Sequence, residues 1–179
     1  MADEPAPERL IHYYDEMTEA KAAIPTKDYK NFLIKWGIDE KQAEMICNRF
    51  DVNKTGFIRR EDLYRDCTGF ANAASVMRDV RILTTDMRPM QLQSIVLYVI
   101  EILQRRMSKQ EQLNAVKQRV ESVYGEGWNC YMTDGKFYSV CSHKAGSSLV
   151  FVYKNLVFGL YQTPGAGKKE STHHSHSHN

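Results

Sequence analysis

Oxygen-bearing side chains recur at alternate positions in the twelve-residue segment 51–62, DVNKTGFIRRED. A loop that wraps Ca²⁺ supplies oxygen ligands from positions 1, 3, 5, 7 and 12, and a glycine at position 6 makes its sharp turn. Gly56 occupies position 6 here. The segment therefore predicts a site for one Ca²⁺ per chain, with ligands from Asp51, Asn53, Thr55, the backbone carbonyl of Phe57, and Asp62.

The last of these ligands is unusual, because such a loop normally closes on a glutamate that binds with both oxygens. Asp62 is one methylene shorter, so it binds through one oxygen or only after the loop tightens, and Mg²⁺ becomes a competitor. Lys54, Arg59 and Arg60 also bring positive charge close to two carboxylates. We expect weak affinity, with a dissociation constant of roughly 10⁻⁵ M or above. The alternative is an empty loop that only holds two helices apart.

Four short helices are expected around this loop, in two helix–loop–helix units. Gly37 is typical of a residue that ends a helix, and Asp39 of one that caps the next. A helix, a twelve-residue cation loop and a second helix make an EF-hand, so residues 1–70 are predicted to form an EF-hand pair. The apolar positions at helical spacing are Leu10, Ile11, Tyr13 and Tyr14; Tyr29, Phe32, Leu33 and Trp36; Ala43, Ile46 and Phe50; and Leu63, Cys67 and Phe70.

The partner of the 51–62 loop is predicted at residues 17–28, MTEAKAAIPTKD. In this frame Ile24 occupies position 8 and pairs with Ile58 of the second loop. Met17, Lys21 and Ala22 occupy positions 1, 5 and 6, where a cation loop needs oxygen ligands and a glycine. The first loop is therefore expected to be metal-free and structural, which excludes cooperative calcium binding within one chain.

The second half of the chain has a different pattern. Residues 71–77 are predicted as a linker, 78–163 as an α+β domain of two helices and an antiparallel sheet, and 164–179 as a disordered His-rich tail. Pro89 is expected in the first turn of one helix, and Ser108 with Glu111 predicts a capping box for the other. Alternating aromatic and β-branched residues predict strands at WNCYMT, KFYSVCSH, SLVFVYK and LVFGLYQT. Tight turns between them are expected at Asp134-Gly135, Ala145-Gly146 and Lys154-Asn155.

Composition removes several classes of function. No apolar run approaches the length of a membrane span, and no export leader opens the sequence, so neither membrane insertion nor secretion is expected. The basic residues are dispersed, which disfavours nucleic acid binding. His12 and His143 are the only histidines outside the tail, and neither has a nucleophile beside it in the sequence. Pairing of His143 with Cys141 across the strand alternation remains a minor alternative, so we expect no enzyme activity.

The stretch from Tyr124 to Thr163 resembles the dynein light chain family. The resemblance lies in a Trp-x-Cys element at 128–130, a Phe-x-Ser element at 137–139 and the aromatic sequence FVY at 151–153, in that order. An EF-hand pair followed by such a domain resembles the tegumental calcium-binding, tegument-allergen-like proteins of parasitic flatworms. That resemblance implies a cytoplasmic protein associated with the tegument.

The family resemblance also implies partners. Dynein light chains are homodimers that exchange a strand and bind extended peptides by strand addition at its edge. Asn129 departs from the family's dimer-interface histidine, and insertions are indicated near Thr133-Asp134 and Ala145–Ser147, so a domain that has lost the groove is the alternative. By residue match the peptide-binding edge strand comprises Phe137, Tyr138, Ser139, Val140, Cys141, Ser142 and His143.

Two functions from different classes follow from these patterns. In the first, the chain is a calcium-binding regulatory protein with one functional EF-hand coupled to a dimerising, peptide-binding domain. In the second, it is a metal-independent scaffold or adaptor whose EF-hand pair is purely structural. The sequence leaves open which of them holds and whether the two modules pack together.

Overall fold

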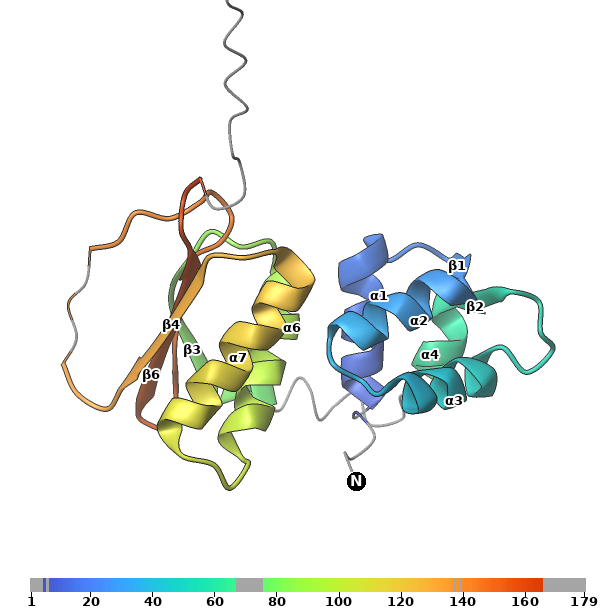
Figure 1. The fold of residues 1–179 in the computed structure, drawn as a ribbon, viewed down its shortest axis with the longest axis horizontal. Coiled ribbons are helices and arrows are strands. Elements are labelled where there is room, and N and C mark those ends of the chain that lie inside the picture. Colours follow the sequence, from blue (N-terminus) through green and yellow to red (C-terminus); the bar gives the residue numbers. More distant parts are fainter. Residues whose placement is uncertain (1–4, 6, 67–75, 137, 139, 166–179) are drawn as a thin grey trace, which may run out of the picture.

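The computed structural model describes residue 5 and residues 7–66, 76–136, 138 and 140–165 of the 179-residue chain. The elements form a helical N-terminal module and a C-terminal module of two helices on a sheet (Figure 1). Residues 71–75 of the predicted linker and 166–179 of the predicted tail lie outside the described residues, as do Cys67 and Phe70 of the fourth predicted helix.

The N-terminal module consists of two helix–strand–helix units. The first contains α1 (Pro7–Thr18), β1 (Ala23–Pro25) and α2 (Thr26–Lys35), and the second α3 (Glu40–Phe50), β2 (Phe57–Arg59) and α4 (Arg60–Asp66). The short strands β1 and β2 pair in antiparallel fashion with Ile24 opposite Ile58, which confirms the predicted pairing of the two loops. Both side chains are buried, with exposed fractions of 5% and 0%. The pair thus fixes the two loops to each other.

Local signals set the ends of these helices. Gly37 follows α2 with φ +88°, a left-handed conformation that residues with a side chain adopt only under strain, so α2 ends there as predicted. Asp39 precedes α3 at the N-cap position, but its side chain makes no capping hydrogen bond. The helix therefore begins where predicted, without the stabilisation that an aspartate cap normally gives.

The C-terminal module confirms the predicted α+β organisation. Its elements are β3 (Val80–Thr85), α6 (Pro89–Leu103), α7 (Lys109–Tyr124), β4 (Trp128–Thr133), β5 (Leu149–Tyr153) and β6 (Leu156–Gln162). The strands form one antiparallel sheet in the order β3-β5-β6-β4, and both helices cover the same face of it (Figure 1).

Two short-range predictions hold in this module. Ser108 Oγ accepts a hydrogen bond from Glu111 N, and Ser108 N donates to Glu111 Oε2, both at 3.2 Å, which is the predicted capping box of α7. Lys154 and Asn155 have φ values of 46° and 62° and connect β5 to β6. Two consecutive left-handed residues give a turn whose twist matches that of the flanking strands. The predicted tight turn at 154–155 is confirmed.

One predicted strand does not form among the residues that the structure describes. The segment KFYSVCSH was expected to be a strand, but its described residues, 136, 138 and 140–143, have no strand pairing and belong to a long excursion between β4 and β5 (Figure 1). Strand composition is not enough, because an extended segment is stabilised only when a neighbouring strand satisfies its backbone groups. Within the described sheet, β4 is an edge strand that pairs only with β6.

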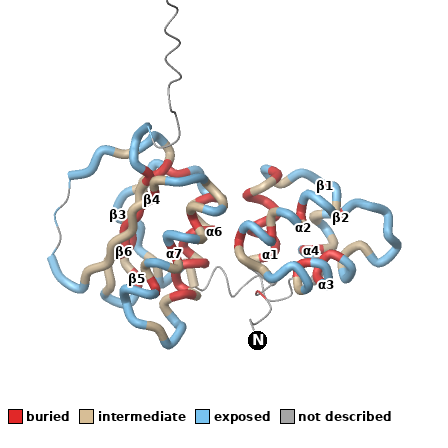
Figure 2. The backbone as a smooth tube through the Cα atoms, in the orientation of Figure 1, coloured by how far each residue is buried: buried red, intermediate tan, exposed pale blue. Residues whose placement is uncertain are grey.

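Helix α6 lies between the two modules. A helix that is apolar on all sides is buried on all sides, and α6 contains eight buried residues distributed around its circumference. It contacts α1 of the first module and α7 of its own module, while α7 contacts α2 and β4. Figure 2 shows the buried segments of α1 and α6 on the sides that face each other. The two modules therefore pack together in this structure.

Aromatic side chains fill the contact between the modules. The ring of Trp36, at the end of α2, stacks on Tyr13 with ring centres 4.7 Å apart, and lies 5.7 Å from Tyr98 of α6 and 5.9 Å from Tyr124 of α7. The exposed fraction of Trp36 is 2%. Packed aromatic pairs of this kind contribute more than their buried area alone. Trp36 thus belongs to the core of both modules.

Polar contacts accompany this packing. Arg88, which precedes α6, donates to Glu16 Oε1 of α1 at 2.5 Å, and Arg9 of α1 pairs with Glu101 of α6. The side chain of Glu16 is only 2% exposed. Burial disfavours the ionised carboxylate more than Arg88 favours it, so the pKa of Glu16 is raised from its ordinary value of 4.5.

This buried carboxylate makes stability depend on pH. Because the pKa of Glu16 is higher in the folded chain than in the unfolded chain, the folded chain binds more protons between the two values. Stability from this group is therefore present below the ordinary pKa and lost as pH rises through the raised pKa. The reverse holds for Asp51 and Asp86, whose pKa values are lowered.

We therefore expect Glu16→Gln to gain stability relative to the wild type as pH rises from about 4 to about 8. Urea unfolding of both proteins at several pH values measures this, since other titrating groups cancel in the difference. Glu19→Gln is the matched control, because Glu19 also approaches Arg88 but its side chain is 86% exposed. A difference between Glu16→Gln and wild type that is constant over this range would contradict the assignment.

Candidate functional site

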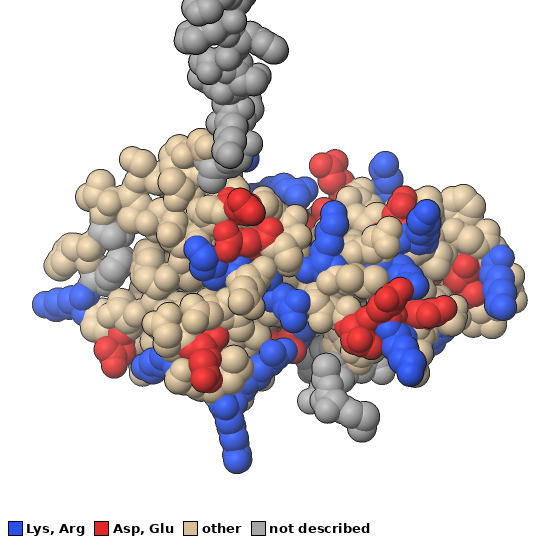
Figure 3. Space-filling model, viewed as in Figure 1, with Lys and Arg blue, Asp and Glu red and all other residues tan. Residues whose placement is uncertain are grey.

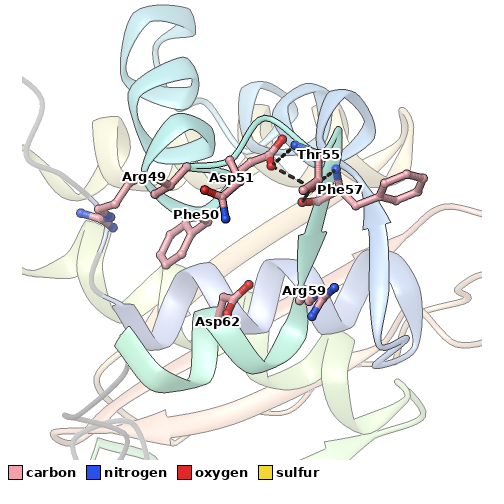
Figure 4. Close-up of a pocket in the computed structure, with 9 residues that line it drawn as sticks. Arg49, Phe50, Asp51, Thr55, Phe57, Arg59 and Asp62 are labelled. Carbon is pink, nitrogen blue, oxygen red and sulfur yellow. Dashed lines mark hydrogen bonds between the residues drawn. The ribbon is translucent and has the colours of Figure 1, made fainter.

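The loop between α3 and α4 is organised around the carboxylate of Asp51 (Figure 4). Its Oδ1 accepts hydrogen bonds from Thr55 N at 2.8 Å and Thr55 Oγ1 at 2.9 Å, and its Oδ2 accepts one from Gly56 N at 3.0 Å. Gly56 has φ +82°, the left-handed conformation that the turn at position 6 requires. The first predicted ligand therefore already lies where the loop folds back on itself.

A fourth hydrogen bond to Asp51 comes from the other unit. Thr26, the first residue of α2, donates its hydroxyl to Asp51 Oδ2 at 3.0 Å. Slight desolvation raises the pKa of Asp51, but the hydrogen bonds from Thr55, Thr26 and Gly56 outweigh it and hold the pKa below its ordinary value. Asp51 is thus held ionised, as a cation ligand must be. Sequence reasoning missed Thr26, since nothing in its own segment marks it as a partner of a residue 25 positions away.

The remaining predicted ligands line the same open pocket. Asn53 and Asp62 are among its lining residues, and Asp62 projects from α4 on the side of the pocket opposite Asp51 (Figure 4). The side chain of Phe57 points away and is 54% exposed, while its backbone carbonyl accepts from Thr55 Oγ1 at 3.2 Å. The structure therefore brings the five predicted ligand residues together around one pocket.

The donor set fits a hard cation. It consists of carboxylate, amide, hydroxyl and carbonyl oxygens, which are the ligands that Ca²⁺ and Mg²⁺ prefer. Within the described ranges no three His, Cys, Asp or Glu side chains form a metal-type cluster. Only two of the five predicted ligands, Asp51 and Asp62, are carboxylates, and the other oxygens come from neutral groups. Arg49 and Arg59 also line the pocket and oppose a cation. The residues present thus suit one weakly held cation.

The first loop is held by its own hydrogen bonds. Tyr14 Oη donates to the carbonyl of Lys21 at 2.7 Å, and Thr18 Oγ1 accepts from Lys21 N at 3.3 Å. These contacts place residues of the loop against the end of α1. Its role in the structure is therefore to support the second loop through β1 and Thr26.

Most described residues of the predicted edge-strand segment are exposed. Tyr138 and Val140 have exposed fractions of 90% and 103%, and Cys141 and Ser142 are also exposed. Phe137 and Ser139 lie outside the described residues. Large apolar side chains this exposed are unusual in a monomer, and they lie one short connection away from the free edge of β4.

The far end of this segment is anchored to the start of α6. Asp86 Oδ2 accepts from Gly146 N and Asp86 Oδ1 from Ser148 N, both at 2.8 Å, and His143 Nδ1 lies 3.7 Å from Asp86 Oδ2. Desolvation raises the pKa of Asp86, but these two backbone donors and His143 outweigh it and lower the pKa. Asp86 was not predicted as a site residue. It fixes where the excursion returns to the sheet.

The model of the dynein light chain type 1 family matches residues 79–163. Those residues include the sheet, both of its helices and the exposed segment. Residues 79–163 form a dynein light chain-like domain. This confirms the resemblance inferred for the second half of the chain.

Solved dynein light chain-like domains also match this part of the chain. The domain of the Fasciola hepatica calcium binding protein FhCaBP2 matches in two structures, with 18% and 17% identity and TM-scores of 0.45 and 0.44. Each match covers 48% of this chain, and they cover 93% and 91% of those chains. The corresponding domain of CsTAL3 matches with 17% identity and a TM-score of 0.42, over 48% of this chain and 93% of that one. Comparison with curated proteins found no significant match.

Two further observations concern membrane-spanning helices and the distribution of surface charge. Among the described helices, none combines the length and apolar character needed to cross a bilayer. On the face shown in Figure 3, acidic and basic side chains are interspersed over both modules and form no continuous basic stripe.

Proposed function

We propose that this protein is a calcium-binding regulatory protein, with one EF-hand site at residues 51–62 and a dimerising, peptide-binding dynein light chain-like domain. The observation that carries the proposal is the loop itself. Asp51, Thr55 and the Phe57 carbonyl converge at the Gly56 turn, and Asp62 projects toward them across the pocket. The antiparallel pairing of Ile24 with Ile58 supports an EF-hand pair, in which one loop is structural.

The expected affinity is modest. Asp62 has one methylene less than the usual glutamate, so it binds the ion through one oxygen or only after the loop tightens. Arg49 and Arg59 beside the pocket reduce the attraction further. A dissociation constant of roughly 10⁻⁵ M or above is expected, with Mg²⁺ as a competitor.

The peptide-binding part of the proposal rests on the free edge of β4 and on the exposed residues 138 and 140–142 of the predicted edge strand. Dynein light chain-like domains generally dimerise and bind peptides. Residues 138 and 140–143, the described part of this segment, have no strand partner, and the outer edge of β4 is unpaired within the described sheet. In a dimer, the segment of each chain would pair with the outer edge of β4 of the other chain, so that both would gain a strand partner. Extended partner peptides would then add beside that strand.

A metal-independent scaffold is the second candidate. Two carboxylates among several cationic side chains favour it, and so does the network of hydrogen bonds that already satisfies Asp51 without an ion. In this alternative the paired loops are purely structural, and the dynein light chain-like domain dimerises regardless of metal.

Calorimetric titration of Ca²⁺ into the full chain tests the proposal, with Mg²⁺ as competitor. Wild type is expected to bind one ion, and Asp51→Ala to bind at least about 100-fold more weakly, because it loses the ligand around which the loop is ordered. Glu61→Ala is the matched control: it removes a neighbouring exposed charge that pairs only loosely with Arg59, at 3.6 Å, so its affinity should stay within about threefold of wild type.

Each outcome selects one function. Equal calcium binding by wild type and Asp51→Ala would contradict the assigned ligand set. No heat with either ion, together with a dimer in sedimentation, would favour the scaffold. A monomer at micromolar concentration would contradict the dimerising domain in both versions.

A further inference from the structure

Two adjacent acidic residues of helix α1 bind arginines from the two different modules. Asp15 binds Arg60 with both oxygens, Oδ1 to Nε and Oδ2 to Nη2, each at 2.7 Å. Glu16 binds Arg88 at 2.5 Å. Arg60 belongs to the 51–62 loop and is the first residue of α4, whereas Arg88 immediately precedes α6. One turn of α1 therefore contacts the cation loop on one side and the dynein light chain-like domain on the other.

Helix α2 makes a second connection between the 51–62 loop and the dynein light chain-like domain. Its first residue, Thr26, donates to Asp51 Oδ2 at 3.0 Å. At its other end the carbonyl of Lys35 accepts from Ser122 Oγ of α7 at 2.6 Å, and Trp36 lies among aromatic rings from both modules. Ten residues of continuous helix thus separate the predicted first calcium ligand from the contact with the second module.

The contact between the modules is closely packed, but some of its buried polar groups lack a hydrogen-bond partner. Glu16 is a buried carboxylate whose pKa is raised by burial, and the Trp36 indole N–H is buried with no hydrogen-bond partner among the described residues. Arg119 of α7 presses its guanidinium into the space that a side chain at Gly37 would fill. Unpaired buried polar groups oppose an interface, so a small displacement of α1 or α2 shifts the balance between the packed and separated arrangements.

Cation binding acts on contacts of both helices. Asp62 and Arg60 belong to the same short helix, α4, so a movement of α4 that lets Asp62 bind the ion also disturbs the Arg60–Asp15 pair. The ion also competes with Thr26 for Asp51 Oδ2. Both changes act against the position of α1 and α2 that the second module requires.

We propose that the hairpin of α1 and α2 couples cation binding at residues 51–62 to the contact with α6 and α7, such that the ion weakens the contact and the contact weakens binding of the ion. This rests on the proposed EF-hand site and names how that site is regulated. Coupling between two equilibria is reciprocal, so a change that loosens the contact increases the affinity for the ion by the same factor.

Reciprocity gives a test with variants remote from the loop. Calcium titration of the full-length Arg88→Gln protein is expected to show an affinity at least about fivefold higher than wild type. Ser94→Val should act in the same direction without a change of charge, because Ser94 is fully buried and its hydroxyl donates to the carbonyl of His12 at 3.4 Å. Arg106→Gln is the matched control for charge: Arg106 is exposed, between α6 and α7, and should bind as wild type does.

A second measurement uses the chain's only two tryptophans. Trp36 lies 5.9 Å from Tyr124, whose ring is 5.9 Å from that of Trp128, so both indoles belong to the cluster at the contact. Calcium is therefore expected to change the tryptophan emission of wild type, with little further change in Arg88→Gln. This readout remains informative if Ser94→Val does not fold.

The outcomes separate the coupling from the proposed function. Wild type that binds calcium with the same affinity as Arg88→Gln, or without a change in emission, would overturn the coupling and leave the EF-hand site standing. An equal gain in Arg88→Gln and Arg106→Gln would assign the effect to net charge and also overturn it. No calcium binding by wild type would remove the proposed site and the coupling together.

Discussion

Replacement of Trp36 by alanine is expected to lower the free energy of unfolding by about 3–5 kcal/mol, the range for removing a buried indole from a packed core. The side chain is 2% exposed and stacks on Tyr13, 4.7 Å away, within its own module. It also packs on Tyr98 and Tyr124 of the second module. Because all these rings lose a neighbour at once, the surroundings cannot collapse into the space, and the loss should lie at the upper end of the range.

Urea unfolding of the full chain measures this loss, with Ile34→Ala as the control on the same helix. Ile34 is 37% exposed and should change stability by less than about 1 kcal/mol. The modules should also become easier to separate, so limited proteolysis between residues 66 and 76 is expected to accelerate in Trp36→Ala only. Equal losses in the two variants would show that Trp36 does not form a shared core.

Local features of this fold could be predicted from the sequence because nearby residues determine them. The capping box at Ser108 and Glu111 needs residues three positions apart. The turn at Lys154-Asn155 needs two residues of suitable conformation between strands. Pairing of Ile24 with Ile58 is long-range, but the loop spacing fixed both positions in advance. In each case the pattern contained all the partners that the structure uses.

The contact between the modules could not be predicted in this way. Asp15 and Glu16 occupy α1 as adjacent acids, which normally indicates the solvated face of a helix, yet both are buried. They are buried because arginines 45 and 72 residues away cover them. The spacing of apolar residues identifies only the side of α1 that faces its own unit. The other side is buried through polar and aromatic residues, which in the sequence look like residues of an exposed surface.

The segment 137–143 shows a second limit. Its alternating residues predict a strand, yet its described residues pair with no strand of their own chain. Strand propensity reflects a fit to a neighbouring surface rather than an intrinsic backbone preference. The sequence therefore identified an element that can pair, although no strand of the described chain pairs with it.

Truncation of Ile58 is the other change with a large expected effect. Ile58 is completely buried and faces Ile24 where β1 meets β2. Ile58→Ala should lower the free energy of unfolding by about 2–5 kcal/mol, because the loss of the larger side chain leaves a cavity beside β1 and the helices α2, α3 and α4 that contact β2. The strand pair also positions the Phe57 carbonyl, so calcium affinity should fall by about tenfold, equivalent to about 1.4 kcal/mol.

Phe57→Ala separates these two effects. It lies next to Ile58 on the same strand, but its side chain is 54% exposed and points away from the pocket, and the substitution retains the carbonyl that is the predicted ligand. Stability should therefore change by less than about 1 kcal/mol and calcium affinity hardly at all. If Ile58→Ala lost stability without losing affinity, the paired strands would support the module only, and the second loop would hold its ion independently of the first.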